Sequence, residues 1–373
     1  MTDQPNLDVG VDASVGTHIH LRVLDTNCSV EVRSPEAADQ LRKDWSRCLV
    51  QAPDADVPSI LATDSTLPLS PEIRYRLVAT LTERAIAALA GRVLMLHAAG
   101  LADDEGRVTA VVASSGAGKT TLARTLCRTH FGYVTDETVA ISDGFDVLPY
   151  PKPLSVIPTG GAPDATKEQF GPDVLGLRPC PKRLAIHRIV LLDRRPGIVT
   201  PHLTPLGYAD ALVELIPQTS AFLQLDRPLV RLCELLDHCG GAYRLSYSDA
   251  SQAAGPLAEP GKAGDQRAAS WAPLSSPVAA TSVTRGCYRS APITDGVEVA
   301  GGEAILMARS RPVRLGPVGL TIWKRAAVPA SFEDLLNAAV SEHGVHPAAP
   351  TMVADAVRTM VAAGVLCGPG PTV

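Results

Sequence analysis

The stretch VVASSGAGKTTLARTLC, residues 111–127, joins a short apolar run, a glycine-rich turn and an amphipathic segment. A short apolar run bounded by a turn is typical of a buried strand, and the apolar spacing after the turn is that of a helix. The stretch therefore predicts a strand, a tight loop and a helix in direct succession.

Residues 113–120 match the pattern A/G-x-x-x-x-G-K-S/T, with alanine in place of the usual first glycine. Gly116 and Gly118 allow backbone conformations that turn successive N–H groups toward one anion, and the helix presents its positive end to the same anion. We expect Lys119 to reach the β- and γ-phosphates of ATP and the Thr120 hydroxyl to ligate Mg²⁺. The residues expected to bind the nucleotide are Ala113, Ser114, Ser115, Gly116, Ala117, Gly118, Lys119, Thr120 and Thr121.

An acidic pair follows in the segment YVTDETVAI, where Asp136 and Glu137 lie 17 and 18 residues beyond Lys119. This separation leaves room for one helix, a return and one strand, which we expect beside the strand that precedes the loop. One carboxylate there would hold Mg²⁺ together with Thr120, and the other would accept a proton from an attacking hydroxyl. The sequence leaves open which acid is the base, since the two would titrate as a coupled pair. The alternative is a solvated turn with two ordinary acids.

Residues 90–250 resemble the catalytic domain of HPr kinase/phosphorylase and the related P-loop serine kinases. The resemblance is carried by LHAAGL (96–101), ASSGAGKTT (113–121), VTDET (134–138) and YPKPLSV (150–156). It implies an ATP- and Mg²⁺-dependent serine kinase in which Lys119, Asp136, Glu137 and His97 are catalytic. Thr120, Asp136 and Glu137 would hold the metal. For His97 the alternative is a packed core histidine.

The chain departs from that family at two places. The family has an acidic residue directly after the loop serine or threonine, where this chain has Thr121. The glycine-rich signature associated with the family's phosphorylase activity has no copy here. The resemblance therefore implies a kinase without pointing to HPr as the substrate.

Composition narrows the class of protein further. The chain has 373 residues, a net charge of −5 and 46% hydrophobic residues, which favours globular domains over a nucleic-acid or membrane-surface binder. It has no apolar run of membrane-spanning length, and its first residues lack the basic and apolar regions of a signal peptide, so we expect a cytoplasmic protein. The eight cysteines form no CxxC pair, and Cys233, His238 and Cys239 lack a second half-site for zinc.

Strands that alternate with helices predict an α/β protein. We expect four parts: a β-rich N-terminal α/β segment over 1–90 that packs on the core, a P-loop kinase-like core over 91–250, a flexible Ala/Gly/Ser/Pro-rich linker over 251–280, and a small domain over 281–373.

The small domain reads as strands followed by three short helices. It resembles the PqqD-like family, the peptide-recognition modules of ribosomal peptide modification, at Leu315 to Trp323, Phe332 to Leu335 and Ala362 to Leu366. The resemblance implies a winged-helix shape that captures a peptide by strand addition at a sheet edge, with a helix as the wall. The alternatives are a DNA-binding winged helix and a plain structural domain. Eight Lys/Arg against seven Asp/Glu after residue 280 argue against DNA.

Together these features predict a kinase that phosphorylates a serine or another hydroxyl of a peptide or protein, with 281–373 holding a precursor-peptide leader. One alternative is an ATP-binding peptide chaperone or adaptor without phosphotransfer, and another is a small-molecule kinase. We expect neither a nucleic-acid nor a membrane partner. The oligomeric state stays open, with a homo-oligomer among the alternatives.

Overall fold

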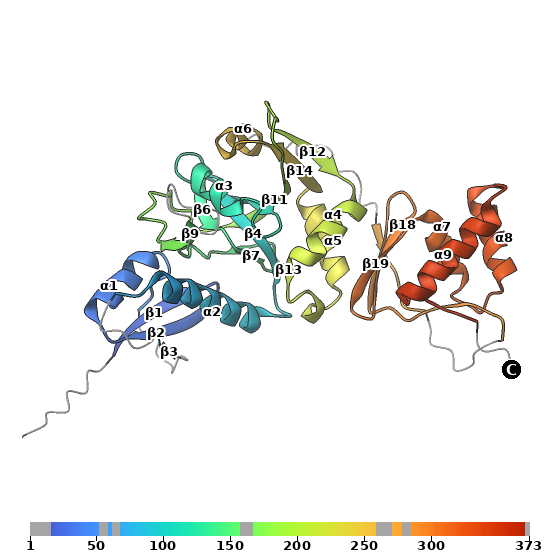
Figure 1. Ribbon diagram of the computed structural model, residues 1–373, viewed down its shortest axis with the longest axis horizontal. Helices are drawn as coiled ribbons and strands as arrows, with labels where there is room; N and C mark the ends of the chain where they lie inside the picture. Colours follow the sequence, from blue (N-terminus) through green and yellow to red (C-terminus); the bar gives the residue numbers. More distant parts are fainter. Residues whose placement is uncertain are drawn as a thin grey trace, which may run out of the picture. The chain divides into compact units, whose positions relative to one another are not determined.

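The computed structural model describes residues 16–51, 59–61, 68–156, 167–258, 271–277 and 285–369 (Figure 1). The chain divides into two compact units. One unit comprises Met1–Ala88 and Tyr150–Leu177, and the other comprises Leu89–Pro149 and Arg178–Val373. Residues 150–177, expected within the kinase-like core, are thus grouped with the N-terminal segment. The predicted position of the N-terminal segment on the core stays a prediction.

The N-terminal unit contains a three-stranded sheet of order β1-β2-β3, in which β1 and β2 are antiparallel and β3 joins β2 in parallel. Its helix α1 begins at Pro35, because the Ser34 side chain accepts a hydrogen bond from the Ala37 N–H and proline is favoured in the first turn. The elements of this unit are β1 (Thr17–Val23), β2 (Thr26–Val32), α1 (Pro35–Asp44), β3 (Ser59–Leu61), α2 (Pro71–Leu89), β9 (Leu154–Val156) and β10 (Glu168–Phe170).

A buried ion pair fastens the two long helices of this unit. Both oxygens of Asp44 accept hydrogen bonds from Arg74, each at 2.8 Å, and Arg74 also donates to the Gln169 carbonyl. Burial raises the pKa of Asp44, and the Arg74 guanidinium opposes that shift. Because Gln169 lies in β10, the same arginine connects the 150–177 segment to α1 and α2.

The second unit is built on a mixed central sheet of order β12-β14-β11-β5-β4-β7-β8, with β6 and β13 also paired to β4. Its parallel part is β5, β11 and β14, and the remaining pairs are antiparallel. The strands are β4 (Leu94–Ala102), β5 (Arg107–Val112), β6 (Gly132–Thr135), β7 (Thr138–Ile141), β8 (Val147–Leu148), β11 (Ala185–Arg194), β12 (His202–Leu206), β13 (Thr219–Ser220) and β14 (Ala242–Tyr247).

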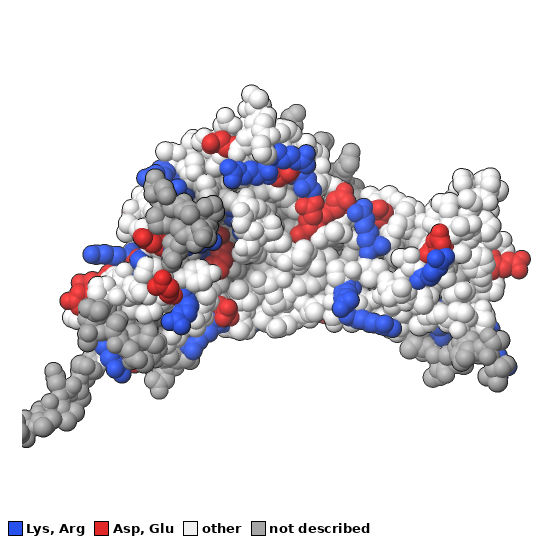
Figure 2. Space-filling view, in the orientation of Figure 1, with Lys and Arg blue, Asp and Glu red and all other residues white. Residues whose placement is uncertain are grey.

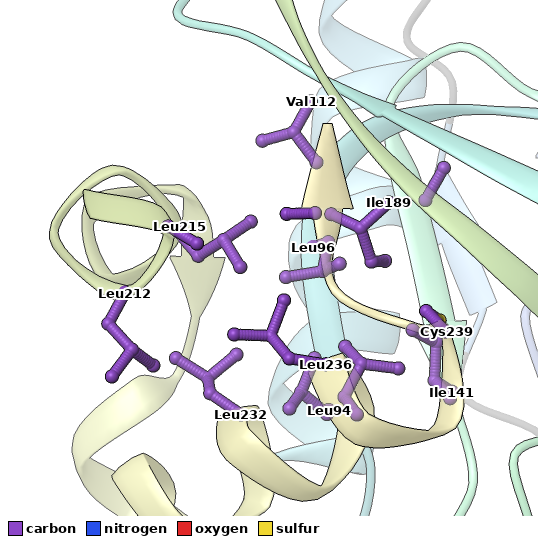
Figure 3. Close-up of a cluster of buried hydrophobic side chains, with 14 of the residues drawn as sticks. Leu94, Leu96, Val112, Ile141, Ile189, Leu212, Leu215, Leu232, Leu236 and Cys239 are labelled. Carbon is purple, nitrogen blue, oxygen red and sulfur yellow. The ribbon is translucent and has the colours of Figure 1, made fainter. Parts of the chain in front are cut away.

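Helices α4 (Tyr208–Leu215) and α5 (Pro228–His238) cover one face of this sheet. Figure 3 shows their leucines meeting side chains from four strands: Leu96 of β4, Val112 of β5, Ile141 of β7 and Ile189 of β11. These strand residues are at most 2% exposed, which explains why the strands read as continuous apolar runs rather than alternating ones. The predicted mixed α/β class is confirmed in this sheet.

Two expectations about the acidic segment are wrong. The segment is not one strand, because the chain bends at Asp136 and Glu137 between β6 and β7; there the Glu137 N–H donates to Thr135 Oγ1 at 3.2 Å instead of joining a ladder. Neither strand lies beside β5, since both pair with β4. The tight turn at 103–106 makes β4 the hairpin partner of β5, so β4 occupies that place.

The C-terminal part has a sheet of order β15-β17-β18-β19 and three helices. Helix α8 begins with a capping box of Ser331 and Asp334, and α9 ends at Gly364 in the left-handed conformation typical of a C-terminal glycine. The elements are β15 (Trp271–Pro273), β17 (Asp295–Val299), β18 (Glu303–Ala308), β19 (Arg311–Leu315), α7 (Pro317–Arg325), α8 (Phe332–His343) and α9 (Ala349–Ala363), with β16 (Arg289–Ser290) and β20 (Leu366–Cys367) as a separate pair.

This sheet has a core on each face. Side chains of a strand alternate between faces, and in β18 Ile305 and Met307 belong to the cluster that contains α4 and α5, whereas Leu306 and Ala308 belong to the cluster with α7, α8 and α9. The side chain of Asp295 in β17 also accepts a hydrogen bond from the Leu229 N–H at the start of α5, at 2.6 Å. The sheet is therefore joined to the core of the second unit by apolar packing and by a helix cap.

The predicted linker over 251–280 contains regular structure where it is described. Residues 254–258 form α6 (Ala254–Ala258), and β15 pairs with β17. The Trp271 indole N–H donates to Asp237 of α5 at 2.8 Å, so apolar burial and a hydrogen bond both hold β15. The rest of the predicted linker, 259–270 and 278–280, lies outside the described residues.

Several charged side chains of the second unit form ion pairs. Arg314 of β19, for example, donates to Asp210 at 2.8 Å and to Glu303 at 2.7 Å, and Figure 2 shows basic and acidic side chains next to one another near α4 and this sheet. None of the described helices has both the length and the apolar composition needed to cross a bilayer.

Candidate functional site

The glycine-rich loop connects the end of β5 at Val112 to α3 (Lys119–Leu126), as the sequence predicts. Gly116 and Gly118 have φ of 81° and 101°, a left-handed region that only glycine adopts without strain. Gly118 is the N-cap of α3 and supplies no side chain, so no side-chain group occupies the positive end of the helix. Ser114, Ser115 and Gly116 are exposed, and the loop is accessible to a ligand.

Lys119 is folded back over this loop. Its Nζ donates to the carbonyl oxygens of Ala113 at 2.5 Å and Ser114 at 3.1 Å, and the residue is only 7% exposed. Burial lowers the Lys119 pKa to about 8, although the charges of Asp136 and Glu137 act in the opposite direction. The ammonium is therefore held at the loop. Burial there disfavours its charged form, and the two carboxylates favour it.

Thr120 and Asp136 are brought together by the fold. The Thr120 hydroxyl donates to Asp136 Oδ2 at 2.8 Å, and the Tyr133 hydroxyl donates to Asp136 Oδ1 at 3.0 Å. Asp136 is 5% exposed. This buried carboxylate is therefore fixed beside the first turn of α3 by two hydroxyl groups.

Glu137 lies on the same bend but is more exposed than Asp136. Its carbonyl accepts a hydrogen bond from the Ala98 N–H at 3.1 Å, which anchors the bend to β4 next to His97. Its negative charge acts on both Lys119 and His97. The two acids thus differ in burial although they are neighbours in sequence.

His97 lies on β4 directly opposite Thr138 of β7 and is half-buried. Burial is the largest cause that lowers its pKa, and the Lys119 charge adds to it, while Glu137 and Asp136 act against the shift. The imidazole is therefore favoured in its neutral form. His97, Lys119, Asp136 and Glu137, predicted as catalytic from separate motifs, form one electrostatic group.

Thr121 has a different environment from Lys119 and Thr120. It is exposed, and it lines a cavity of about 180 Å³ together with Gly118, Thr125, Arg194, Tyr247, Asp249 and Ala250. The sequence reasoning did not select Tyr133, Arg194, Tyr247 or Asp249 for this region. Tyr133 could have been found because it precedes Asp136 by three residues, but the other three come from segments whose meeting depends on the order of the sheet.

Cys233, His238 and Cys239 are packed against other side chains. Cys233 and Cys239 are buried, and burial raises the pKa of Cys239 to about 12. The His238 ring stacks on Phe145 with centroids 3.9 Å apart, and its Nε2 lies 3.1 Å from the Ile186 carbonyl oxygen. Within the described residues, no group of three or more His, Cys, Asp or Glu side chains is placed to hold a metal ion.

Comparison with known proteins gives limited similarity. No family model matches the chain, and no curated protein matches its sequence. One solved structure to which it is similar is the Hpr(Ser) kinase/phosphatase from Coxiella burnetii, with 12% identity, 44% of this chain and 89% of that chain covered, and a TM-score of 0.23.

Proposed function

We propose that the chain is an ATP- and Mg²⁺-dependent kinase that transfers the γ-phosphate to a serine or another hydroxyl of a peptide or protein. The observation that carries the proposal is the 2.8 Å contact of Thr120 with Asp136, beside a left-handed glycine loop that ends in Lys119. A phosphate-binding loop, a hydroxyl and two acids are the parts that phosphoryl transfer requires.

The donor set fits a magnesium ion. Mg²⁺ prefers hard oxygen ligands and commonly uses one or two carboxylates together with substrate phosphates. Thr120 Oγ1 and Asp136 supply such oxygens from adjacent elements, and the more exposed Glu137 adjoins them. We assign Thr120 and Asp136 to the metal, which would neutralise the charge of the phosphates when it is bound.

The other polar groups of the site bind the phosphates or take part in the transfer. Backbone N–H groups of 113–118 and the Lys119 ammonium bind the phosphates. We assign Glu137 as the base, because it is more accessible than Asp136: its carboxylate takes the acceptor's proton as the acceptor oxygen bonds to the γ-phosphorus and the bond to the leaving ADP oxygen breaks. We assign to His97, whose neutral form is favoured by burial, the donation of a hydrogen bond to the transferring group.

The kinase proposal is tested with the full chain, ATP labelled in its γ-phosphate, Mg²⁺ and candidate peptides. Lys119→Ala is expected to abolish transfer of the label, while Lys182→Ala, a change at an exposed lysine outside the site, leaves it unchanged. Full transfer by Lys119→Ala would refute the mechanism. ATP binding without any transfer would favour the chaperone or adaptor alternative.

We also propose that residues 281–373 hold the leader of a precursor peptide, as PqqD-like modules of ribosomal peptide modification do. Support comes from β19, which is an edge strand of its sheet with Arg311 and Pro312 exposed. A Cβ on Gly319 would lie 3.6 Å from Leu315 at the end of β19 and 3.9 Å from Met360, so α9 packs beside that end. An extended peptide would add to β19 with α9 as a wall.

Hydrogen exchange tests this capture directly. Addition of the leader peptide of a candidate precursor is expected to protect amides of β19. Amides of β15, at the other edge of the sheet, serve as the control and are expected to stay unchanged. Protection of β15 alone, or of neither edge, would contradict strand addition at β19.

A further inference from the structure

The cavity beside Gly118 lies at the carboxyl ends of three adjacent parallel strands. The loop follows β5, Arg194 ends β11, and Tyr247 ends β14, where it is the direct partner of Arg194 in the ladder. Ligands of open α/β sheets bind outside the carboxyl ends of their strands. Because Gly118 belongs both to the cavity and to the phosphate loop, the two sites are continuous.

Tyr247 is the polar residue that indicates a ligand-binding site here. It is 2% exposed, yet its hydroxyl forms no hydrogen bond with any residue in the described part of the chain, and it lies 3.6 Å from where a Cβ on Gly118 would be. Because Tyr247 lines the cavity, a ligand group next to Gly118 can form a hydrogen bond with its hydroxyl.

Two charged side chains line the same cavity. Arg194 donates through Nε to the Ser248 carbonyl at 3.2 Å, which positions its guanidinium. Asp249 uses Oδ1 for the Ser251 N–H at 2.8 Å and the Ser251 hydroxyl at 2.6 Å, and these bonds fix its carboxylate at the start of η3 (Ala250–Ala253). A planar guanidinium can stack on an aromatic ring, and a carboxylate accepts hydrogen bonds from sugar hydroxyls or ring N–H groups.

We infer that this cavity binds the nucleoside part of the nucleotide, with Tyr247, Arg194 and Asp249 as the residues that recognise it. The inference rests on the proposed function, since the phosphates of the same nucleotide occupy the loop. At about 180 Å³ the cavity is smaller than the roughly 300 Å³ or more of sites that enclose whole ligands, which suits one moiety of a larger molecule. It also explains the exposed position of Thr121, which forms part of the wall.

The phosphoryl-transfer residues are a separate group. Besides burial, the charges of Asp136 and Glu137 act on the pKa of both His97 and Lys119, and the Lys119 charge also acts on His97. The nucleoside would therefore lie on the Thr121 side of the loop, and the hydroxyl acceptor would approach the group that contains Glu137.

The test compares the affinities of ATP and inorganic tripolyphosphate for the full chain in the same Mg²⁺ buffer. Wild type is expected to bind ATP at least about tenfold more tightly, because only ATP fills the cavity. Tyr247→Phe removes the hydroxyl and keeps the ring, and should weaken ATP binding about fivefold, the value of one hydrogen bond, without changing tripolyphosphate binding. Thr125→Trp fills the cavity and should weaken ATP binding further.

Tyr243→Phe, the same chemical change four residues earlier on β14, is the matched control and should alter neither affinity. Lys119→Ala should weaken both ligands, since it acts on the phosphates. Equal affinities of wild type for the two ligands, or an unchanged ATP affinity in Thr125→Trp, would overturn the nucleoside assignment and leave the phosphate site standing. Failure of wild type to bind either ligand would refute the proposed function itself.

Discussion

At the level of single residues, the neighbouring acids Asp136 and Glu137 lie in different environments. Asp136 is buried and receives hydrogen bonds from Thr120 and Tyr133, whereas Glu137 is partly exposed and acts on His97 and Lys119 through its charge. One residue step along the chain separates the carboxylate that we assign to the metal from the carboxylate that we assign as the base. This difference comes from the bend between β6 and β7.

Asp136→Asn should show whether the buried acid is the metal ligand. We expect γ-phosphate transfer to fall by about 10²–10³, the effect of removing one group that stabilises transition-state charge, and the remaining activity to require more Mg²⁺. Initial rates over a series of Mg²⁺ concentrations measure both effects. Tyr133→Phe, which removes only a hydrogen bond to Asp136, should cost about fivefold. An unchanged Mg²⁺ requirement in Asp136→Asn would assign the metal elsewhere.

The lowered pKa of Lys119 predicts a pH dependence of nucleotide binding. In the free protein, burial brings this pKa to about 8, so the side chain loses its proton as the pH rises through that value. Bound phosphates favour the charged ammonium, so binding above about pH 8 must take up a proton, and affinity must fall as the pH increases. Calorimetric titrations near pH 8.5 in two buffers of different ionisation enthalpy measure that uptake. Equal proton uptake by wild type and Lys119→Met would contradict the assignment.

At the scale of the element, the loop depends on backbone conformation more than on side chains. Gly118 ends the loop at φ 101° and begins α3 without a capping side chain. Its neighbour Lys119 provides the ammonium, but the N–H groups can converge only if the two glycines keep their left-handed conformation. A change that adds one methyl group is therefore a test of the loop as a cradle for an anion.

Gly118→Ala should reduce ATP affinity by tenfold or more. The nearest atom to the added Cβ is the Tyr247 hydroxyl at 3.6 Å, an ordinary contact, so the cost is the conformational strain of about 1–2 kcal/mol at positive φ. The chain relieves this strain by turning the N–H groups away from the phosphates. Gly144→Ala, at a turn glycine without positive φ and with no atom closer than 3.8 Å, is the control. Equal affinities of the two variants would show that the loop conformation is not required.

At the scale of the whole molecule, the second unit shares apolar packing between its central sheet and its C-terminal sheet. Ile305 and Met307 of β18 lie in the cluster that contains α4 and α5, and the Asp295 side chain caps α5 through Leu229. Removal of 281–373 would therefore expose core surface as well as delete the segment that we propose to bind a peptide. Point variants are the better way to separate these two consequences.

Ile305→Ala should destabilise the phosphate-loop strand as well as the C-terminal sheet. A buried isoleucine truncated to alanine costs about 2–5 kcal/mol, and the shared cluster would carry the effect to β5. Hydrogen exchange of β5 amides under native conditions should therefore become faster. Val328→Ala, at a side chain that is 61% exposed, should leave exchange unchanged. Unaltered β5 exchange in Ile305→Ala would mean that the two sheets unfold independently.

Much of this chain could be predicted from local patterns. The loop at 113–118 follows β5 and precedes α3 as expected, and Ser34, Ser331 and Gly364 stand at the helix ends that their residue types indicate. These features follow from interactions between residues that are close in sequence, such as caps, turns and periodic burial. For the same reason the acidic pair could be recognised, since its residue types and spacing are local.

Contacts between distant segments depend on the order of the strands, and only the tertiary structure shows that order. It places β4 between β5 and the acidic bend, and it brings Arg194 to Tyr247 and Asp249. It also packs β17 and β18 against α4 and α5, so that residues up to about a hundred positions apart are in one cluster. Periodicity tells which face of a strand is buried but not which element covers it, because many partners satisfy the same apolar pattern. Local sequence patterns are therefore enough to predict the glycine-rich loop and the acidic pair, whereas the cavity beside them depends on how the sheet packs.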